Sequence, residues 1–381
     1  MTKRQGIRAI LFVVVLAAVL WWIDDIYRFQ PNAANLHTIR RFDELYSDTK
    51  DTWDGILVGT SNVDRAWAAP AAYEVYGMTV YPLSTDGGPF FLSTTVIEEA
   101  LKYQDLSFVV VDLHGVKDEN LISNPVKVRR VLDNMKRSGN WLKAVDKSIK
   151  YLQTYCADNM DSDATTLRWS YYLPILKYHS RLMSDGITWA DIFKGSTNMK
   201  GVYQANQHRK TNRIHLIGNT DYHEASDLQK ELLDEIIDCC EEHDLQLIFV
   251  NVPTELPEDE QESINSAAHY VEEKGYKVLN FNDGDLLEDS DMNGDEDFFD
   301  TNHMNTKGAR KFTEYFAGWL SENVEGLTDH RGDERYASWD EAVQNYEAFY
   351  EKSLKQIAKW LEKHPLEDSS EVDEDAEDTD D

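Results

Sequence analysis

A serine near the start of the chain and an aspartate–histidine pair near its end are of the residue types that nucleophilic catalysis requires. Ser61 follows Gly59 and Thr60, directly after the apolar run 55–58, and Asp300 precedes His303 by three residues. Within one loop, a carboxylate at this spacing can accept a hydrogen bond from one imidazole nitrogen and leave the other nitrogen facing a nucleophile. The sequence therefore predicts a Ser61, Asp300, His303 triad, in that chain order.

Two glycines and one asparagine are candidates for stabilising the negative charge that such a reaction develops. Gly87 and Gly88 follow the next apolar run, and Asn62 adjoins the serine. Paired glycines let backbone N–H groups approach a ligand closely, as an oxyanion hole requires, and an amide side chain can donate a further hydrogen bond. The alternatives are a helix N-cap at the serine and an ordinary tight turn at the glycines.

The segments around these residues alternate between strand and helix patterns. The expected strands are 55–58, 79–83, 108–113, 245–250 and 276–281. The expected helices are 90–103, 226–243, 258–274, 310–320 and 339–364. Continuous Val/Ile/Leu strands between helices indicate an α/β fold with a mostly parallel sheet that is covered on both faces. Ligands of such sheets bind at the carboxyl ends of the strands, where the candidate residues fall.

The domain organisation follows from these patterns and from composition. Residues 28–325 form the predicted α/β domain, and its helical, aromatic stretch 117–221 is interpreted as an insertion or cap over the sheet. A helical segment, 326–364, follows it. Residues 365–381 are strongly acidic and almost free of apolar side chains, so we expect a disordered tail.

The N-terminus carries a membrane-targeting pattern within residues 1–27. Lys3, Arg4 and Arg8 precede an apolar run from Ala9 to Ile23. The run contains bulky Trp21 and Trp22 where a signal peptide would need small residues for cleavage, so an uncleaved anchor is favoured over a cleaved signal. The positive flank predicts a cytoplasmic N-terminus and an exported catalytic domain.

Charge and cysteine content exclude several classes of protein. The 381 residues include 38 Lys+Arg and 70 Asp+Glu, a formal net charge of −32. Nucleic-acid binding needs a clustered basic face, so no nucleic-acid partner is expected. Cys156, Cys239 and Cys240 have neither the spacing of a zinc site nor that of a disulfide framework.

An acidic loop supports a competing calcium interpretation. Residues 289–300 carry acidic or amide side chains at positions 1, 3, 5, 7, 9 and 12 and glycine at position 6, as in an EF-hand loop. Position 12 is Asp300 where glutamate is usual, and 282–285 leaves little room for an entering helix. Because Asp300 is also the predicted partner of His303, we expect no metal or other cofactor at the catalytic site, and calcium at this loop remains an alternative to a solvated acidic loop.

The Gly-x-Ser segment and the Asp-x-x-His-x-Asn-x-x-Gly segment together resemble the SGNH/GDSL hydrolase superfamily. The resemblance covers about residues 53–320 and is closest to its membrane-anchored bacterial branch of DltD-like and alginate-acetylation-type proteins. It implies a three-layer, flavodoxin-like fold, Ser61 as nucleophile, Asp300 and His303 as its partners, and Gly87 or Gly88 at the oxyanion.

The resemblance is incomplete after the third strand. The Gly-x-Asn-Asp segment that supplies the usual asparagine donor is absent, and Asp112-Leu113-His114-Gly115 stands in its place. His114 and Asn62 are the candidate replacements. The family implies an exported, anchored serine O-acyl esterase or acyltransferase that acts on a cell-envelope polysaccharide or teichoic-acid-like polymer, with a membrane acyl-transfer partner. The alternative is a non-catalytic envelope-binding or scaffold protein on a degenerate SGNH fold, either with or without stabilisation by calcium.

Overall fold

The computed structural model describes residues 2–27, 33–117, 121–180, 197–204, 214–216 and 218–364. Its centre is a five-stranded, all-parallel sheet with the order β2-β1-β3-β4-β5. The strands are β1 (Gly55–Val58), β2 (Val80–Pro82), β3 (Phe108–Asp112), β4 (Gln246–Asn251) and β5 (Lys277–Asn280). The predicted α/β class is confirmed, and each strand lies within two residues of its predicted range.

The strand order reverses between β1 and β3. The chain runs from β1 outward to β2 and then returns to pair β3 on the other side of β1. Val58 pairs with Val111, so Gly59, the first residue after β1, lies beside Asp112, the last residue of β3. The carboxyl edge at such a reversal is where parallel sheets bind ligands.

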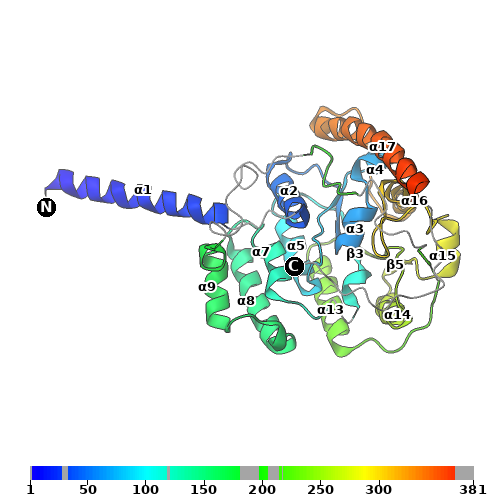
Figure 1. Cartoon of the computed structure of the whole chain (residues 1–381), viewed down its shortest axis with the longest axis horizontal. Helices are drawn as coiled ribbons and strands as arrows, with labels where there is room; N and C mark the ends of the chain where they lie inside the picture. The colour runs from blue at the N-terminus through cyan, green and yellow to red at the C-terminus, as the bar shows by residue number, and fades with distance from the viewer. Residues whose placement is uncertain are drawn as a thin grey trace.

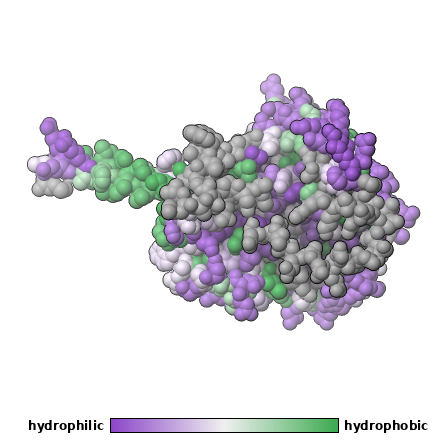
Figure 2. Space-filling model, viewed as in Figure 1, coloured by the Kyte–Doolittle hydropathy of each residue, from purple (hydrophilic) through white to green (hydrophobic). Residues whose placement is uncertain are grey.

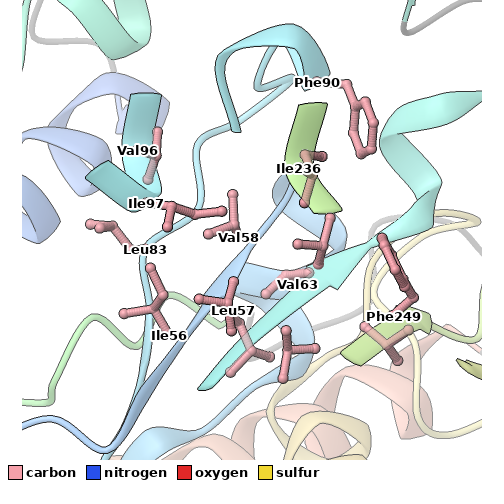
Figure 3. Packing of buried hydrophobic residues seen from close by; sticks show 14 of the residues in the cluster. Ile56, Leu57, Val58, Val63, Leu83, Phe90, Val96, Ile97, Ile236 and Phe249 are labelled. Carbon is pink, nitrogen blue, oxygen red and sulfur yellow. The ribbon is translucent and has the colours of Figure 1, made fainter. Parts of the chain in front are cut away.

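Two groups of helices cover the sheet. The core helices are α3 (Ser61–Ala66), α4 (Ala69–Tyr76), α5 (Ser93–Ala100), α13 (Asp227–Glu242), α14 (Glu258–Glu273) and α16 (Thr306–Asn323). Helix α16 packs against α3 and α4, whereas α13 packs against α5 and α14. Right-handed crossovers place these two groups on opposite faces. Figure 3 shows Ile97 of α5 next to Val58 of β1, in the core between this helix and the sheet.

The segment predicted as a helical insertion is largely helical between residues 125 and 178, whereas its described residues 197–204, 214–216 and 218–221 contain no helix. It contains α7 (Pro125–Leu132), α8 (Gly139–Tyr155), α9 (Ala164–Tyr172) and α10 (Ile175–Tyr178). Helix α8 packs against α5, and its Tyr151 ring stacks on Phe91 with centroids 3.9 Å apart. Figure 1 shows α7, α8 and α9 next to one another beside α5. These helices therefore extend the α5 side of the sheet.

Three further helices belong to the described body. Helix α17 (Ala337–Lys363) packs on α4 and α16, and its Trp339 belongs to the same buried cluster as the sheet, so the predicted C-terminal helical segment is joined to the α/β core. Helix α2 (Ala33–Ser47) is absent from the sequence-based expectations. A six-residue helix, α15 (Gly284–Asp289), also occupies the segment where little room for a helix was expected.

Helix α1 (Lys3–Tyr27) extends away from the body, as Figure 1 shows. In Figure 2 it is green along most of its length, with a purple tip at the N-terminus. The stretch Lys3–Asp24 has 22 residues and is long and apolar enough to cross a membrane. At about 1.5 Å per residue it reaches the roughly 30 Å of a hydrocarbon core, which the apolar run alone would not span.

Candidate active site

Ser61 begins helix α3 immediately after strand β1. Thr60 is the N-cap, and its side chain accepts a hydrogen bond from the Asn62 N–H. Gly59 makes the tight connection, because a Cβ atom there would lie 2.6 Å from the Cβ of Asp112 and 2.9 Å from Val63. The chain can pass this close to β3 only without a side chain at position 59, which places the Ser61 hydroxyl at the carboxyl edge of the sheet.

The loop that carries His303 is held at both ends. Phe298 and Met304 form an isolated antiparallel bridge, and the Phe299 N–H donates to the His303 carbonyl at 2.8 Å. Asn305 then caps α16 by accepting from the N–H groups of residues 307 and 308, and its own amide donates to the carbonyls of residues 296 and 298. Helix α16 begins at Thr306, four residues before the predicted start, because Asn305 supplies this cap.

The structure brings Ser61, His303 and Asp300 together. The Ser61 Oγ lies 2.8 Å from the His303 Nε2, and the His303 Nδ1 lies 2.8 Å from an Asp300 carboxylate oxygen. In the neutral imidazole, an Nδ1–H that donates to Asp300 leaves Nε2 free to accept the Ser61 proton. These are the contacts that a nucleophile, its general base and the group that orients the base must make.

Asp300 remains ionised in this arrangement. Burial by itself would raise the pKa of its carboxyl, but hydrogen bonding to His303, the charge of His303 and the backbone N–H groups of Asn302 and His303 together hold the pKa below its ordinary value. The Asn302 N–H donates to Asp300 at 3.0 Å. Asp300 can therefore stabilise an imidazolium that forms during reaction without taking its proton.

The two glycines predicted at the oxyanion lie in the turn after β2, and the backbone N–H of one of them is already used within that turn. The Gly88 N–H donates to the Thr85 carbonyl at 2.9 Å, so it closes a turn, and the expectation that it faces an oxyanion is not met. Gly87 has φ +55°, a left-handed conformation that favours glycine. The turn itself abuts the nucleophile segment, because the Thr85 N–H donates to the Gly59 carbonyl at 3.2 Å.

Asn62 is buried and its amide faces His114. The Thr60 hydroxyl donates to the Asn62 carbonyl oxygen at 3.3 Å, which leaves the amide nitrogen 3.4 Å from the His114 Nδ1. The contact with His114 occupies one of the two amide N–H groups, and Asn62 as an oxyanion donor stays a prediction. Because Nδ1 accepts in this contact, neutral His114 carries its proton on Nε2.

His114 is the residue whose importance the sequence understated. It is buried beyond the end of β3, and its backbone N–H donates to the Asp112 carboxylate at 3.1 Å. Burial, followed by the positive charges of Lys117 and His303, holds the pKa of the His114 imidazole well below its usual range. His114 is thus a neutral imidazole in the neighbourhood of His303. The signal in the sequence was its position, because His114 stands where the Gly-x-Asn-Asp segment is missing.

A buried ion pair supports the nucleophile helix from α2. The Arg41 guanidinium lies 2.7 Å from the Asp64 carboxylate and donates to the Ser84 carbonyl at 3.3 Å. Burial raises the pKa of Asp64 to about 7, although Arg41 acts in the opposite direction. The pair joins α2, α3 and the turn after β2. Sequence reasoning missed Arg41, because neither periodicity nor spacing distinguishes a buried arginine from an exposed one.

The acidic loop 289–300 has lysine partners. Lys311 lies 3.0 Å from the Asp291 carboxylate and 3.2 Å from that of Asp297, and Lys307 pairs with Glu296. Asp300 is bound to His303. Within the described part of the chain, no group of three or more His, Cys, Asp or Glu side chains is arranged to hold a metal ion.

Comparison with models of protein families finds none that matches this chain, and comparison with curated proteins finds no significant similarity.

Proposed function

We propose that this protein is a membrane-anchored serine O-acyl esterase or acyltransferase of the SGNH/GDSL type. The proposal is supported chiefly by one observation, the Ser61–His303–Asp300 chain of two 2.8 Å contacts at the carboxyl edge of a parallel sheet. With an N-terminal anchor, the natural substrate class is a cell-envelope polysaccharide or a teichoic-acid-like polymer. In this proposal the N-terminus is cytoplasmic and the catalytic domain is exported.

The proposed reaction proceeds through an acyl-serine. His303 Nε2 takes the Ser61 proton as Oγ attacks the acyl carbonyl, and the imidazolium then returns that proton to the leaving oxygen as the ester bond breaks. Water or an acceptor hydroxyl next attacks the acyl-serine, His303 removes its proton, and Ser61 regains a proton on release. Backbone N–H groups of Ser61 and Gly87, with the Nε2–H of His114, are the candidate donors to the oxyanion.

Active-site labelling tests the proposal directly. Full-length protein treated with a fluorophosphonate probe should be modified at Ser61, and Ser61→Ala should abolish the modification. Asp300→Asn should slow it strongly, because an amide at this place in a triad lowers kcat by about 10⁴. Labelling that persists in Ser61→Ala, or no labelling of a folded wild-type protein, would favour the non-catalytic scaffold.

A partition experiment then separates hydrolysis from transfer. An aryl acetate releases its phenol in the acylation step, and added glycerol or a soluble glycan then competes with water for the acyl-serine. Accumulation of acylated acceptor in proportion to its concentration would indicate a transferase, whereas acetate as the sole product would indicate an esterase.

A further inference from the structure

A buried carboxylate, that of Asp24, fixes the end of the anchor helix to the body. One oxygen of Asp24 lies 2.8 Å from the Arg137 guanidinium, and the other accepts from the Ile175 N–H at 3.1 Å. Asp24 is only 6% exposed, although it closes a stretch that is otherwise uncovered by the body. The anchor thus joins the body at a defined place, the start of α10, and its direction relative to α10 is set by two hydrogen-bonded contacts.

Three large apolar side chains are exposed beside that place. Leu173 and Leu176 are 44% and 53% exposed, and Trp169 is 53% exposed. Leu173 and Leu176 are one or two residues from Ile175, so their Cα atoms lie within roughly 8 Å of the residue that binds Asp24. Trp169 is one helical turn away, because its carbonyl accepts from the Leu173 N–H. The three side chains, named here the α9–α10 face, therefore lie within two helical turns of the residue that binds the end of the anchor.

The surroundings of the α9–α10 face favour lipid as its partner. Trp21 and Trp22 are exposed on the last turns of the anchor, and the Arg137 guanidinium lies 5.6 Å from the centre of the Trp21 ring. Tryptophan next to arginine at the end of an apolar helix is the composition of a membrane–water interface. A protein surface next to the Trp21–Trp22 end of the anchor lies at the boundary between lipid headgroups and acyl chains. Apolar side chains at this boundary are buried about 5–10 Å deep.

We propose that the α9–α10 face is a second membrane contact, in which Trp169, Leu173 and Leu176 insert into the lipid interface beside the anchor. The proposal rests on the anchoring included in the proposed function. Its consequence is orientation. A body held by a single membrane helix can tilt together with that helix, whereas a body held by the helix and an adjacent face keeps its catalytic edge at a constant height and angle above the bilayer.

Site-specific quenching tests this contact in the full-length protein. Leu176→Cys is prepared in a Cys239→Ser background, since Cys156 and Cys240 are buried, and is labelled with bimane. The labelled protein is placed in nanodiscs of phosphatidylcholine and phosphatidylglycerol that contain phosphatidylcholine with a spin label near the top of its acyl chain. Leu16→Cys in α1 and Val75→Cys in α4, both 44% exposed, serve as the anchor control and the body control.

The expected result is quenching at position 176 comparable to that at position 16, with none above background at position 75. Quenching at 16 without quenching at 176 would overturn the second contact and leave the anchor intact. Absence of quenching at 16 would instead refute the anchoring. Lipid-independent self-quenching at 176 that grows with protein density would assign the face to a second copy of the chain and also overturn the proposal. Fluorophosphonate labelling of each variant reports separately whether Ser61 remains competent.

Discussion

At the scale of single residues, the site separates a charged group from neutral ones. Asp300 is held as a carboxylate by its hydrogen bonds, whereas His114 is held neutral by burial. Both groups lie near Ser61. The Asp300 carboxylate can stabilise a transient imidazolium on His303, whereas the neutral His114 imidazole can donate a hydrogen bond without adding a full charge to the site. Different surroundings thus give these two ionisable side chains different roles.

The role of His114 as a donor can be measured with two substitutions. We expect His114→Ala to lower kcat for an aryl ester by about 10²–10³, the usual loss for one oxyanion donor, while KM changes little. His114→Asn replaces the ring with a shorter donor and should recover part of that loss. Equal activity in the wild type and both variants would show that His114 has only a structural role.

The buried carboxyl of Asp112 predicts a pH dependence of stability. Burial raises its pKa to about 7 in spite of the hydrogen bonds that it accepts. Between about pH 4 and pH 7 the folded protein therefore retains a proton that the unfolded chain has released, so the free energy of unfolding falls as the pH rises through this window.

Asp112→Asn removes this contribution, and its free energy of unfolding should vary less between pH 4 and pH 7 than that of the wild type. Denaturant titrations at several pH values measure the slope, and the slope is the readout because the amide also changes absolute stability. Parallel pH profiles for the two proteins would contradict the raised pKa.

At the scale of elements, the position of His303 depends on how closely α16 approaches the preceding loop. A Cβ atom at Gly308 would lie 2.1 Å from the Asp297 carbonyl oxygen, whereas one at Gly284, in α15, would meet no atom within 4 Å. Asp297 and the Asn305 cap lie at the two ends of the segment that carries His303. Movement of α16 away from Asp297 therefore displaces the general base.

The two glycines form a matched pair for mutation. Gly308→Ala should lower the free energy of unfolding by about 1–3 kcal/mol, as other overpacked substitutions do, and should slow labelling of Ser61. Gly284→Ala should leave labelling unchanged and leave stability equal or higher by up to about 1 kcal/mol, because alanine favours a helix. Denaturation and labelling rates measured on both variants check the contrast. Similar effects of the two substitutions would show that the close approach of α16 is unimportant.

At the scale of the whole molecule, the net charge of −32 opposes compaction. Many carboxylates have basic partners, as Asp291 and Asp297 have in Lys311, but acidic residues outnumber basic ones. Self-repulsion of this kind is screened over a Debye length of roughly 30 Å at 0.01 M salt and 10 Å at 0.1 M. The thermal stability of the folded chain should therefore increase with ionic strength and should depend little on which cation supplies it.

This expectation also discriminates against the calcium alternative. Sodium chloride raised from low to physiological concentration should increase the Tm of the full chain, and calcium at matched ionic strength should add nothing further. A differential scan in sodium chloride, calcium chloride and chelator measures both effects. An additional increase with calcium that the chelator reverses would show specific binding, because a ligand of the folded state raises Tm by mass action.

Much of the secondary structure was predictable because it is encoded locally. The apolar runs at 55–58 and 108–113 correspond to β1 and β3, and Ser226 supplies the cap of the predicted helix at 226–243. Local patterns were less informative about where a helix begins, and they missed one helix altogether. Helix α16 starts early because of Asn305, and α2 was missed, although its Arg41 is among the most buried side chains.

The sequence by itself determined which residue types are available for chemistry, where the sheet ends expose them, and that an apolar helix precedes the body. Only the tertiary structure decided that Ser61 meets His303, that Gly88 is used in a turn, and that Asn62 faces His114. The reason is physical. Periodicity and capping act over a few residues and survive in a one-dimensional pattern, whereas a contact between distant segments depends on how the sheet and its helices pack as a whole.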